Sequence, residues 1–435
     1  MTTTTPPLRA EQKFSEISLL NKVEAFALFV FAASVSLSIA GAHISLGLLT
    51  LCVMAQRAWR RGHGATSGGQ RAEGKEQKVS YKLGIEWPIL AFVTVALIST
   101  ALSELPFASF RNLRHLLTIL GAYTVAFSLR RHPEWRKPVL WTFIGIATIA
   151  ALWGLAEYAF GRSNKVQSTQ GTTMTWGALC VMFMSFTWQM ALAASSRRER
   201  WLARWQFLPQ IFAMLFSLVR GAYVGFASSV IYLMKPYWSN RRLLLTKILP
   251  GFLLLIIMVT LVSPQSVQQR LAAIFDLNTP STQVRLIQWQ HALTIAADHP
   301  FFGVGWRDLQ AVLRQYAAPD PNVSEEINHN VFRIGHFHNT YITILVCFGI
   351  PGLAAFLWLM IAVWQRLGAA AKHAGREEER SVIHASRAAM LGFLVAGLFD
   401  WTFGDAEVVT MFWFVIGVGL GQAPISSVSK SERIA

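Results

Sequence analysis

Long uncharged stretches constrain the fold of this chain more than any other feature of its sequence. Residues 25–56 contain no Lys, Arg, Asp or Glu. A transmembrane helix needs about 20 mostly apolar residues, so this stretch is too long for one untilted span at a rise of about 1.5 Å per residue. Basic residues flank both ends, with Lys13 and Lys22 before it and Arg57 after it. Because basic residues favour the cytoplasmic side, the stretch predicts a two-span hairpin that turns near Gly41.

The composition agrees with a membrane protein and excludes intrinsic disorder. Hydrophobic residues make up 53% of the chain and charged residues 14%. Soluble domains carry about 25% charged residues, and disordered chains are poor in apolar ones. Cys52, Cys180 and Cys347 lie in separate apolar runs, which predicts buried thiols and no disulfide. The N-terminus lacks the pattern of a removable signal peptide, so the first span is expected to direct insertion.

The same criterion, applied along the chain, predicts an all-α integral membrane protein of about twelve transmembrane helices. The spans are expected near residues 22–40, 42–58, 84–103, 112–129, 138–159, 172–194, 205–219, 221–235, 246–263, 338–365, 384–400 and 406–422. The predicted parts are a tail 1–21, helices one to nine in 22–263, an outer loop 264–337, helices ten to twelve in 338–422 and a tail 423–435. The loop is too long for a connector and has helical patterning, which predicts a small helical domain.

The distribution of basic residues supports this topology. The net charge is +16, which in a soluble protein would indicate nucleic-acid binding. Here 29 of the 39 Lys and Arg residues fall in segments assigned to the cytoplasm, as the positive-inside rule requires. We therefore expect no nucleic-acid partner, and we place both termini in the cytoplasm.

Arg220 stands out among the ten basic residues that remain outside. It is the sole charge in residues 205–234, a stretch bracketed by cytoplasmic basic clusters that must therefore cross the membrane twice. Each arm is then about 15 residues or ~22 Å long, shorter than a hydrocarbon core of about 30 Å. The turn at Arg220 is expected below the outer surface, where an arginine by default indicates a function and an anionic partner. The alternatives are snorkelling to the headgroups, or an ion pair with Glu157 or Asp400.

Two pairs of outer residues and a single arginine are further candidates. Arg285 and Trp289 share a helical face in the outer loop, an arrangement that amphipathic surface helices also show. Arg111 and Arg114 lie three apart at the start of the fourth span, where a helix N-terminus favours phosphate and interfacial snorkelling is equally compatible. Arg307 follows a Gly-Val-Gly-Trp turn and is a candidate for a phosphate or saccharide contact.

A group of histidines directly precedes the tenth span. Its members are His329, Arg333, His336 and His338. Their spacing matches no standard zinc pattern and no cysteine is near, so no metal is predicted. An imidazole that titrates near neutral pH favours a general base at the membrane surface, with a structural histidine bound to a headgroup as the alternative. Asp400, Asp405 and Glu407 cluster outside between the last two spans, where they could orient the histidine or hold a sugar.

Together these residues fit one class of reaction. Arginines in an outer-leaflet pocket would hold a lipid-linked phosphate or diphosphate, because the planar guanidinium donates in pairs and stays charged. A nearby histidine could deprotonate an acceptor hydroxyl. The sequence shows no acidic cluster of the kind that holds Mg²⁺, so arginine is the predicted charge stabiliser and no cofactor is expected.

Three motifs resemble the superfamily of WaaL-type O-antigen ligases and Wzy-type polymerases. They are Arg220-Gly-Ala-Tyr-Val-Gly, then Ser281…Arg285…Trp289…Ala292…Pro300…Gly303-Val-Gly305, then His338-Asn-Thr-Tyr…Gly349…Gly352. The resemblance implies a GT-C-like membrane glycosyltransferase of lipopolysaccharide biosynthesis in the bacterial inner membrane. It implies metal-independent, inverting transfer of the O-antigen from undecaprenyl diphosphate to lipid A–core on the periplasmic face. It makes Arg220, Arg285 and His338 the expected catalytic residues. The expected substrate-binding residues are Arg111, Arg114, Trp289, Arg307, Arg333 and His336.

Other functions remain open alternatives. An O-antigen polymerase would use another lipid-linked glycan as acceptor, and one large outer loop before a histidine-led span favours the ligase. A protein-glycosylating relative would usually carry a further C-terminal soluble domain, whereas this chain ends soon after Gln422. Ion-coupled transporters place acidic groups near mid-membrane, whereas the acidic residues here fall near span ends.

Overall fold

The computed structural model describes residues 8–64, 81–238, 246, 279–333 and 335–423, and within them every regular element is a helix. The first half contains α1 (Leu8–Ser34), α2 (Ile39–Gly64), α3 (Glu86–Leu102), α4 (Pro106–Leu113), η1 (Arg114–Ile119), α5 (Leu120–Arg131), η2 (Pro133–Trp135), α6 (Arg136–Ala159), η3 (Ser168–Gln170), α7 (Thr173–Ala193), α8 (Arg197–Phe216), α9 (Arg220–Met234) and η4 (Lys235–Tyr237). The second half contains α13 (Pro280–Asp298), α14 (Leu309–Tyr316), α15 (Glu325–Arg333), α16 (Thr340–His373), α17 (Glu377–Ala396) and α18 (Ala406–Leu420).

Helices overlap every predicted span except 246–263, which lies outside the described residues apart from Thr246. Among the described helices, four are long and apolar enough to cross a membrane, namely α2, α6 with η2, α7 and α16. The helical membrane character is therefore confirmed, while twelve spans and a GT-C architecture stay predictions. The predicted tails 1–21 and 423–435 lie largely outside the described side chains.

Some helix ends differ from the predicted span boundaries. The first span was expected to reach residue 40, but α1 ends at Ser34. The seventh was expected to begin at residue 205, but α8 begins at Arg197. The cause is local capping, because the Ser196 side chain accepts a hydrogen bond from the Glu199 N–H (3.1 Å), a favourable helix start. A span predicted from hydropathy leaves out the charged first turn of α8, although that turn is helical.

Helices α7 and α18 form the centre of the bundle, since most of their side chains are buried, including Trp176 and Trp413. Helix α17 packs against both α9 and α7, which also contact each other. Small residues let α9 and α17 approach closely, and the Ser229 hydroxyl donates to the Ala388 carbonyl (2.8 Å). Such contacts are typical of helix pairs in membranes. They fix α9, and therefore Arg220 at its N-terminus, relative to α17.

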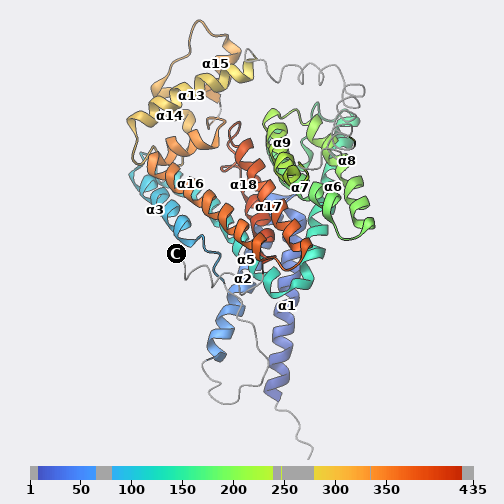
Figure 1. Ribbon diagram of the computed structural model, residues 1–435. Coiled ribbons are helices and arrows are strands. Elements are labelled where there is room, and N and C mark those ends of the chain that lie inside the picture. Colours follow the sequence, from blue (N-terminus) through green and yellow to red (C-terminus); the bar gives the residue numbers. More distant parts are fainter. Residues whose placement is uncertain (1–7, 65–80, 239–245, 247–278, 334, 424–435) are drawn as a thin grey trace, which may run out of the picture.

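Helices α13, α14 and α15 gather at one end of the bundle, beyond the N-terminus of α16 (Figure 1). The link between α13 and α14 docks on α16, because the N–H groups of Val304 and Gly305 donate to the carbonyls of Val346 and Cys347 (2.9 and 3.0 Å). Gly303 has a φ of +63° and lies directly against this backbone, where a side chain would clash. The glycine motif therefore attaches the link between α13 and α14 to the bundle.

The topology makes a prediction that thiol labelling can test. The three native cysteines are buried and free, so a cysteine-free background should fold. In that background Ser67→Cys is expected to be cytoplasmic and Ser324→Cys periplasmic. An impermeant maleimide, added to cells with a permeabilised outer membrane, should label the cysteine at 324 and leave the one at 67 unlabelled until the inner membrane is opened. Labelling of position 67 in intact spheroplasts would overturn the orientation.

Candidate active site

Arg220 lies at the turn between α8 and α9. It is the first residue of α9, and the turn before it contains Leu218 with a φ of +59°. The loop that follows α6 reaches this turn, because the Val166 N–H donates to the Phe216 carbonyl (3.0 Å). The loop therefore brings Lys165 to the same place as Arg220.

A cavity of about 210 Å³ adjoins this turn and collects charged residues from four separate segments. Lys165, Arg220, Arg285 and Asp400 all line it. Burial lowers the pKa of Arg285, while the Asp400 carboxylate raises it and the Arg220 charge lowers it further. Three cationic groups and one anionic group line the cavity, so the lining carries a net positive charge that suits a multiply charged anion.

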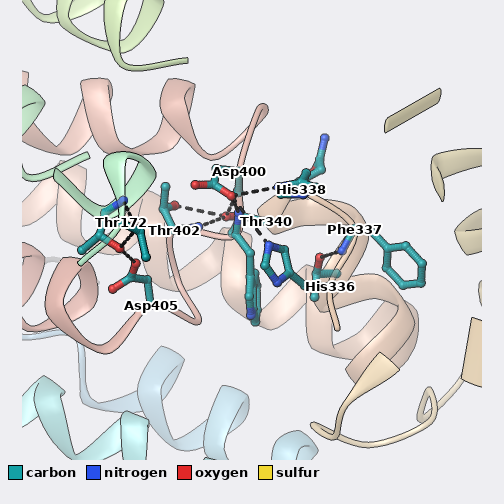
Figure 2. A network of polar contacts seen from close by, with 12 residues as sticks. Thr172, His336, Phe337, His338, Thr340, Asp400, Thr402 and Asp405 are labelled. Carbon is teal, nitrogen blue, oxygen red and sulfur yellow. Dashed lines mark hydrogen bonds and ion pairs between the residues drawn. The ribbon is translucent and has the colours of Figure 1, made fainter. Parts of the chain in front are cut away.

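His338 does not line this cavity itself, but it precedes the N-terminus of α16 and lies against Asp400, which does line the cavity. Asn339 caps the helix, accepting from the N–H groups of Tyr341 and Ile342 (2.9 and 3.0 Å). The His338 Nδ1 atom lies 3.3 Å from Asp400 Oδ1 (Figure 2). His338 itself has a φ of +47°, a conformation that costs energy for a residue with a side chain and is often found at functional sites. Asn339 therefore fixes the start of α16, and Asp400 orients the imidazole of His338.

His336 lies near the same carboxylate oxygen. Its Nε2 atom is 3.8 Å from Asp400 Oδ1, and its ring centroid is 4.7 Å from that of His338. Burial, together with the neighbouring His338, lowers the pKa of His336 to about 4, so its imidazole is neutral at neutral pH. Ligand atoms of the two histidines and Asp400 lie within 4.8 Å of one another, close enough to hold a metal ion. The expected absence of a metal therefore stays a prediction.

Two of the predicted contact residues have structural partners. The Trp289 indole N–H donates to the Phe337 carbonyl (2.8 Å), which ties α13 to the backbone between the two histidines. The Arg307 guanidinium pairs with Glu104 (3.0 Å) and is almost fully buried. Neither residue lines the cavity of Arg220 and Arg285. Trp289 fixes α13, which carries Arg285, to the segment that carries the histidines.

Three other predicted contact residues lie apart from this cavity. Arg111 and Arg114 are exposed at the junction of α4 and η1. Arg333 is exposed in the last turn of α15 and lines a groove between α14 and α15. None of the three lines the cavity with Arg220. Their assignment to substrate binding therefore stays a prediction without support from the geometry.

The structure adds Lys165 to the candidate residues and gives Asp400 a specific partner. Lys165 belongs to a polar loop without a motif, so its predicted position outside the membrane was the sole signal in the sequence. Asp400 and His338 are 62 positions apart, and no local spacing connects them. Asp405, by contrast, caps α18 by accepting from the Glu407 and Val408 N–H groups (3.1 and 3.3 Å), which is a structural role.

Residues 205–357 match the family model described as O-Antigen ligase. The resemblance to the O-antigen ligase and polymerase superfamily is confirmed. The matched region contains Arg220, Arg285 and His338, whereas Lys165 and Asp400 lie outside it. No curated protein matches the chain. Together with the apolar helices, the match indicates a membrane enzyme of glycosyl transfer, of the ligase or polymerase type.

The lowered pKa of His336 predicts how activity depends on pH. With a pKa of about 4, His336 is already deprotonated throughout the range from about pH 5 to 8 in which an ordinary histidine titrates. His336→Gln should therefore leave the acidic limb of a plot of kcat/KM against pH at the same position. Measured transfer rates of the purified variant check this. A displaced limb would show that His336 is the group whose protonation stops the reaction.

Proposed function

We propose that the protein is an O-antigen ligase of lipopolysaccharide biosynthesis. In this proposal it transfers the O-antigen glycan from undecaprenyl diphosphate to a sugar of lipid A–core, on the periplasmic face of the bacterial inner membrane. The observation that carries it is the meeting of Arg220 and Arg285 in one cavity beside a histidine held by Asp400. The reaction needs no metal and inverts the anomeric carbon.

The cavity with Arg220 and Arg285 would hold the donor diphosphate. Guanidinium groups donate paired hydrogen bonds to phosphate oxygens and keep their charge. The first residues of α9 also line the cavity, and the N-terminus of a helix favours an anion. As the bond from the sugar to the diphosphate breaks, negative charge grows on the leaving oxygen. Fixed positive groups stabilise that charge most in the transition state.

His338 would act as the general base. Its Nδ1 lies near Asp400, so the carboxylate favours the tautomer that carries the proton on Nδ1 and leaves the Nε2 lone pair available. Nε2 removes the proton of the acceptor hydroxyl while the oxygen forms a bond to C1 of the donor sugar. The bond from C1 to the diphosphate oxygen breaks and its electron pair leaves with the diphosphate. Attack from the opposite face inverts C1.

A deletion strain separates the ligase from the polymerase alternative, which the family match also covers. Loss of a ligase should leave undecaprenyl-linked O-chains in the membrane and lipopolysaccharide without O-antigen. Loss of a polymerase should leave lipopolysaccharide that carries one repeat unit. Gel analysis of lipopolysaccharide and mass spectrometry of the lipid-linked fraction give the two readouts. Restoration by the wild-type chain, and failure of a His338→Ala copy to restore, completes the test.

Substitution of Arg220 tests the role of the cavity. Removing one donor that stabilises a developing charge costs about 10²–10³ in rate, so Arg220→Ala should lower kcat by that amount. Arg220→Lys keeps the charge but loses the planar fork, and it should also be impaired. Transfer is measured with purified, folded protein, with Arg162→Ala as the control for an outer arginine that does not line the cavity. Near-normal transfer by Arg220→Ala would reduce this arginine to a structural role.

Substitutions at His338 and Asp400 test the base. His338→Ala should lower transfer by about 10²–10⁴ while donor binding survives. Asp400→Asn should lower it by about 10² or more, because the amide no longer selects the tautomer. Asp405→Asn is the matched control, since asparagine also caps a helix, and it should keep its activity. His336→Ala should be milder than His338→Ala.

The same assay decides whether a metal takes part. EDTA should leave transfer unchanged, because the proposed reaction stabilises charge with arginines. Complete inhibition by EDTA that zinc restores would instead assign His336, His338 and Asp400 as ligands. Loss of donor binding in His338→Ala would indicate that His338 contacts the phosphate and is not the general base.

A further inference from the structure

Lys165 reaches the cavity of Arg220 from a short loop that hydrogen bonds hold in place. The Ser163 hydroxyl donates to the Lys165 carbonyl (2.6 Å) and accepts from the Lys165 N–H (3.3 Å). The next residue, Val166, is buried, and its N–H donates to the Phe216 carbonyl (3.0 Å). The backbone on both sides of Lys165 is therefore fixed, which keeps this residue on the cavity lining.

The charged residues of the cavity come from different sides of α7. Helix α6 packs on α7 and α8, whereas α17 packs on α7 and α9, and Figure 1 shows α6 and α8 at one side of the bundle with α17 nearer its centre. Lys165 follows α6, and Asp400 follows α17. Burial, the Asp400 carboxylate and the Arg220 charge shift the pKa of Arg285, which places Arg285 near Asp400. Lys165 therefore approaches from the side of α6 and α8, and His338 contacts the cavity through Asp400.

An apolar stripe on α6 leads to the loop of Lys165. Its members Ile149, Trp153 and Phe160 are all exposed, and spacings of four and seven residues put them on one face of the helix. Helix α6 with η2 is long and apolar enough to cross a membrane, and in a bilayer such a face contacts acyl chains. A lipid whose phosphate lies at Lys165 would therefore have an apolar surface for its tail beside it.

We infer that Lys165 binds the phosphate linked to the undecaprenyl chain, while Arg285 binds the phosphate linked to the sugar. This inference rests on the proposed function and adds the direction in which the donor lies. The sugar must lie near His338, because its C1 is attacked by the hydroxyl that the histidine deprotonates. The sugar-linked phosphate then lies on the side of Asp400 and Arg285. The other phosphate lies at Lys165, and the tail leaves along α6.

The two phosphates make different demands on the residues that bind them. When the bond from C1 breaks, negative charge grows on an oxygen of the sugar-linked phosphate, so its ligands act most in the transition state. The prenyl-linked phosphate is charged before and after this step. Lys165 therefore binds the substrate and the transition state about equally, and a point charge such as an ammonium group is enough for that task.

Steady-state kinetics test this difference. Lys165→Gln should raise KM for the lipid-linked donor about tenfold with little change in kcat, whereas Arg285→Gln should lower kcat by about 10²–10³. Lys165→Arg keeps the charge, and its KM should stay within about threefold of the wild-type value. The matched control is Arg162→Gln, which removes a charge from the same loop but not from the cavity lining. A fall in kcat at unchanged KM in folded Lys165→Gln would overturn the inference.

Binding of two lipids tests the direction of the donor without any transfer. Undecaprenyl monophosphate carries only the prenyl-linked phosphate, and undecaprenyl diphosphate carries both. In thermophoresis with purified protein in detergent, Lys165→Gln should weaken the binding of both lipids about tenfold, and Arg285→Gln should weaken only that of the diphosphate. The reverse pattern, equal weakening of both lipids by both variants, or unchanged binding in Lys165→Gln would overturn the inference.

The wild-type protein separates this inference from the proposed function. A wild type that binds neither lipid would overturn the proposed donor site, and the inference with it. A wild type that binds both lipids yet transfers no glycan to lipid A–core would contradict the proposed reaction alone. In that case the binding losses of Lys165→Gln and Arg285→Gln still decide the direction in which the diphosphate lies.

Discussion

The site depends on the contact between the N-terminus of α16 and the segment that follows α17. The Thr340 N–H donates to the Gly397 carbonyl (2.7 Å), and the Thr340 hydroxyl donates to the Asp400 carbonyl (2.9 Å). The Asn339 amide donates to the Leu398 carbonyl (3.0 Å). The two side-chain bonds are partly buried, and a polar group that loses its partner away from water is costly. The backbone therefore fixes His338 against Asp400 before any substrate binds.

A second constraint brings α13 to the same place. Gly349 interrupts α16 with a φ of +68°, and the N–H of Ile350 then donates to the Pro300 carbonyl (2.7 Å). Trp289 holds α13 against the backbone next to His338. The motif residues thus divide into glycines and Trp289, which position helices, and arginines, which line the cavity. Glycines and Trp289 place α13 on the bundle, and this placement carries Arg285 to the cavity that contains Arg220.

The sequence could predict features that depend on local chain chemistry. An arginine alone in a long apolar stretch predicted a hairpin with Arg220 at its turn, because two basic flanks require two crossings. Arg285 could be assigned to the active site only through the family resemblance, because an Arg and a Trp on one helical face also occur in ordinary surface helices. The sequence offered three carboxylates that could orient the histidine, but the choice of Asp400 for His338 and the approach of Lys165 depend on loops that meet in three dimensions. No periodicity or spacing encodes such contacts, so the structure was needed to find them.

The charge of the donor cavity has a consequence for the whole catalytic cycle. Lys165, Arg220 and Arg285 face one carboxylate, and Asp400 already accepts from the Trp401 N–H (2.9 Å) and contacts His338. Like charges repel in the empty site, and a diphosphate relieves that repulsion. In the proposed reaction the departing diphosphate carries more negative charge than the donor that entered. The groups that stabilise the transition state therefore hold the lipid product more tightly than the substrate, so the cavity opposes product release.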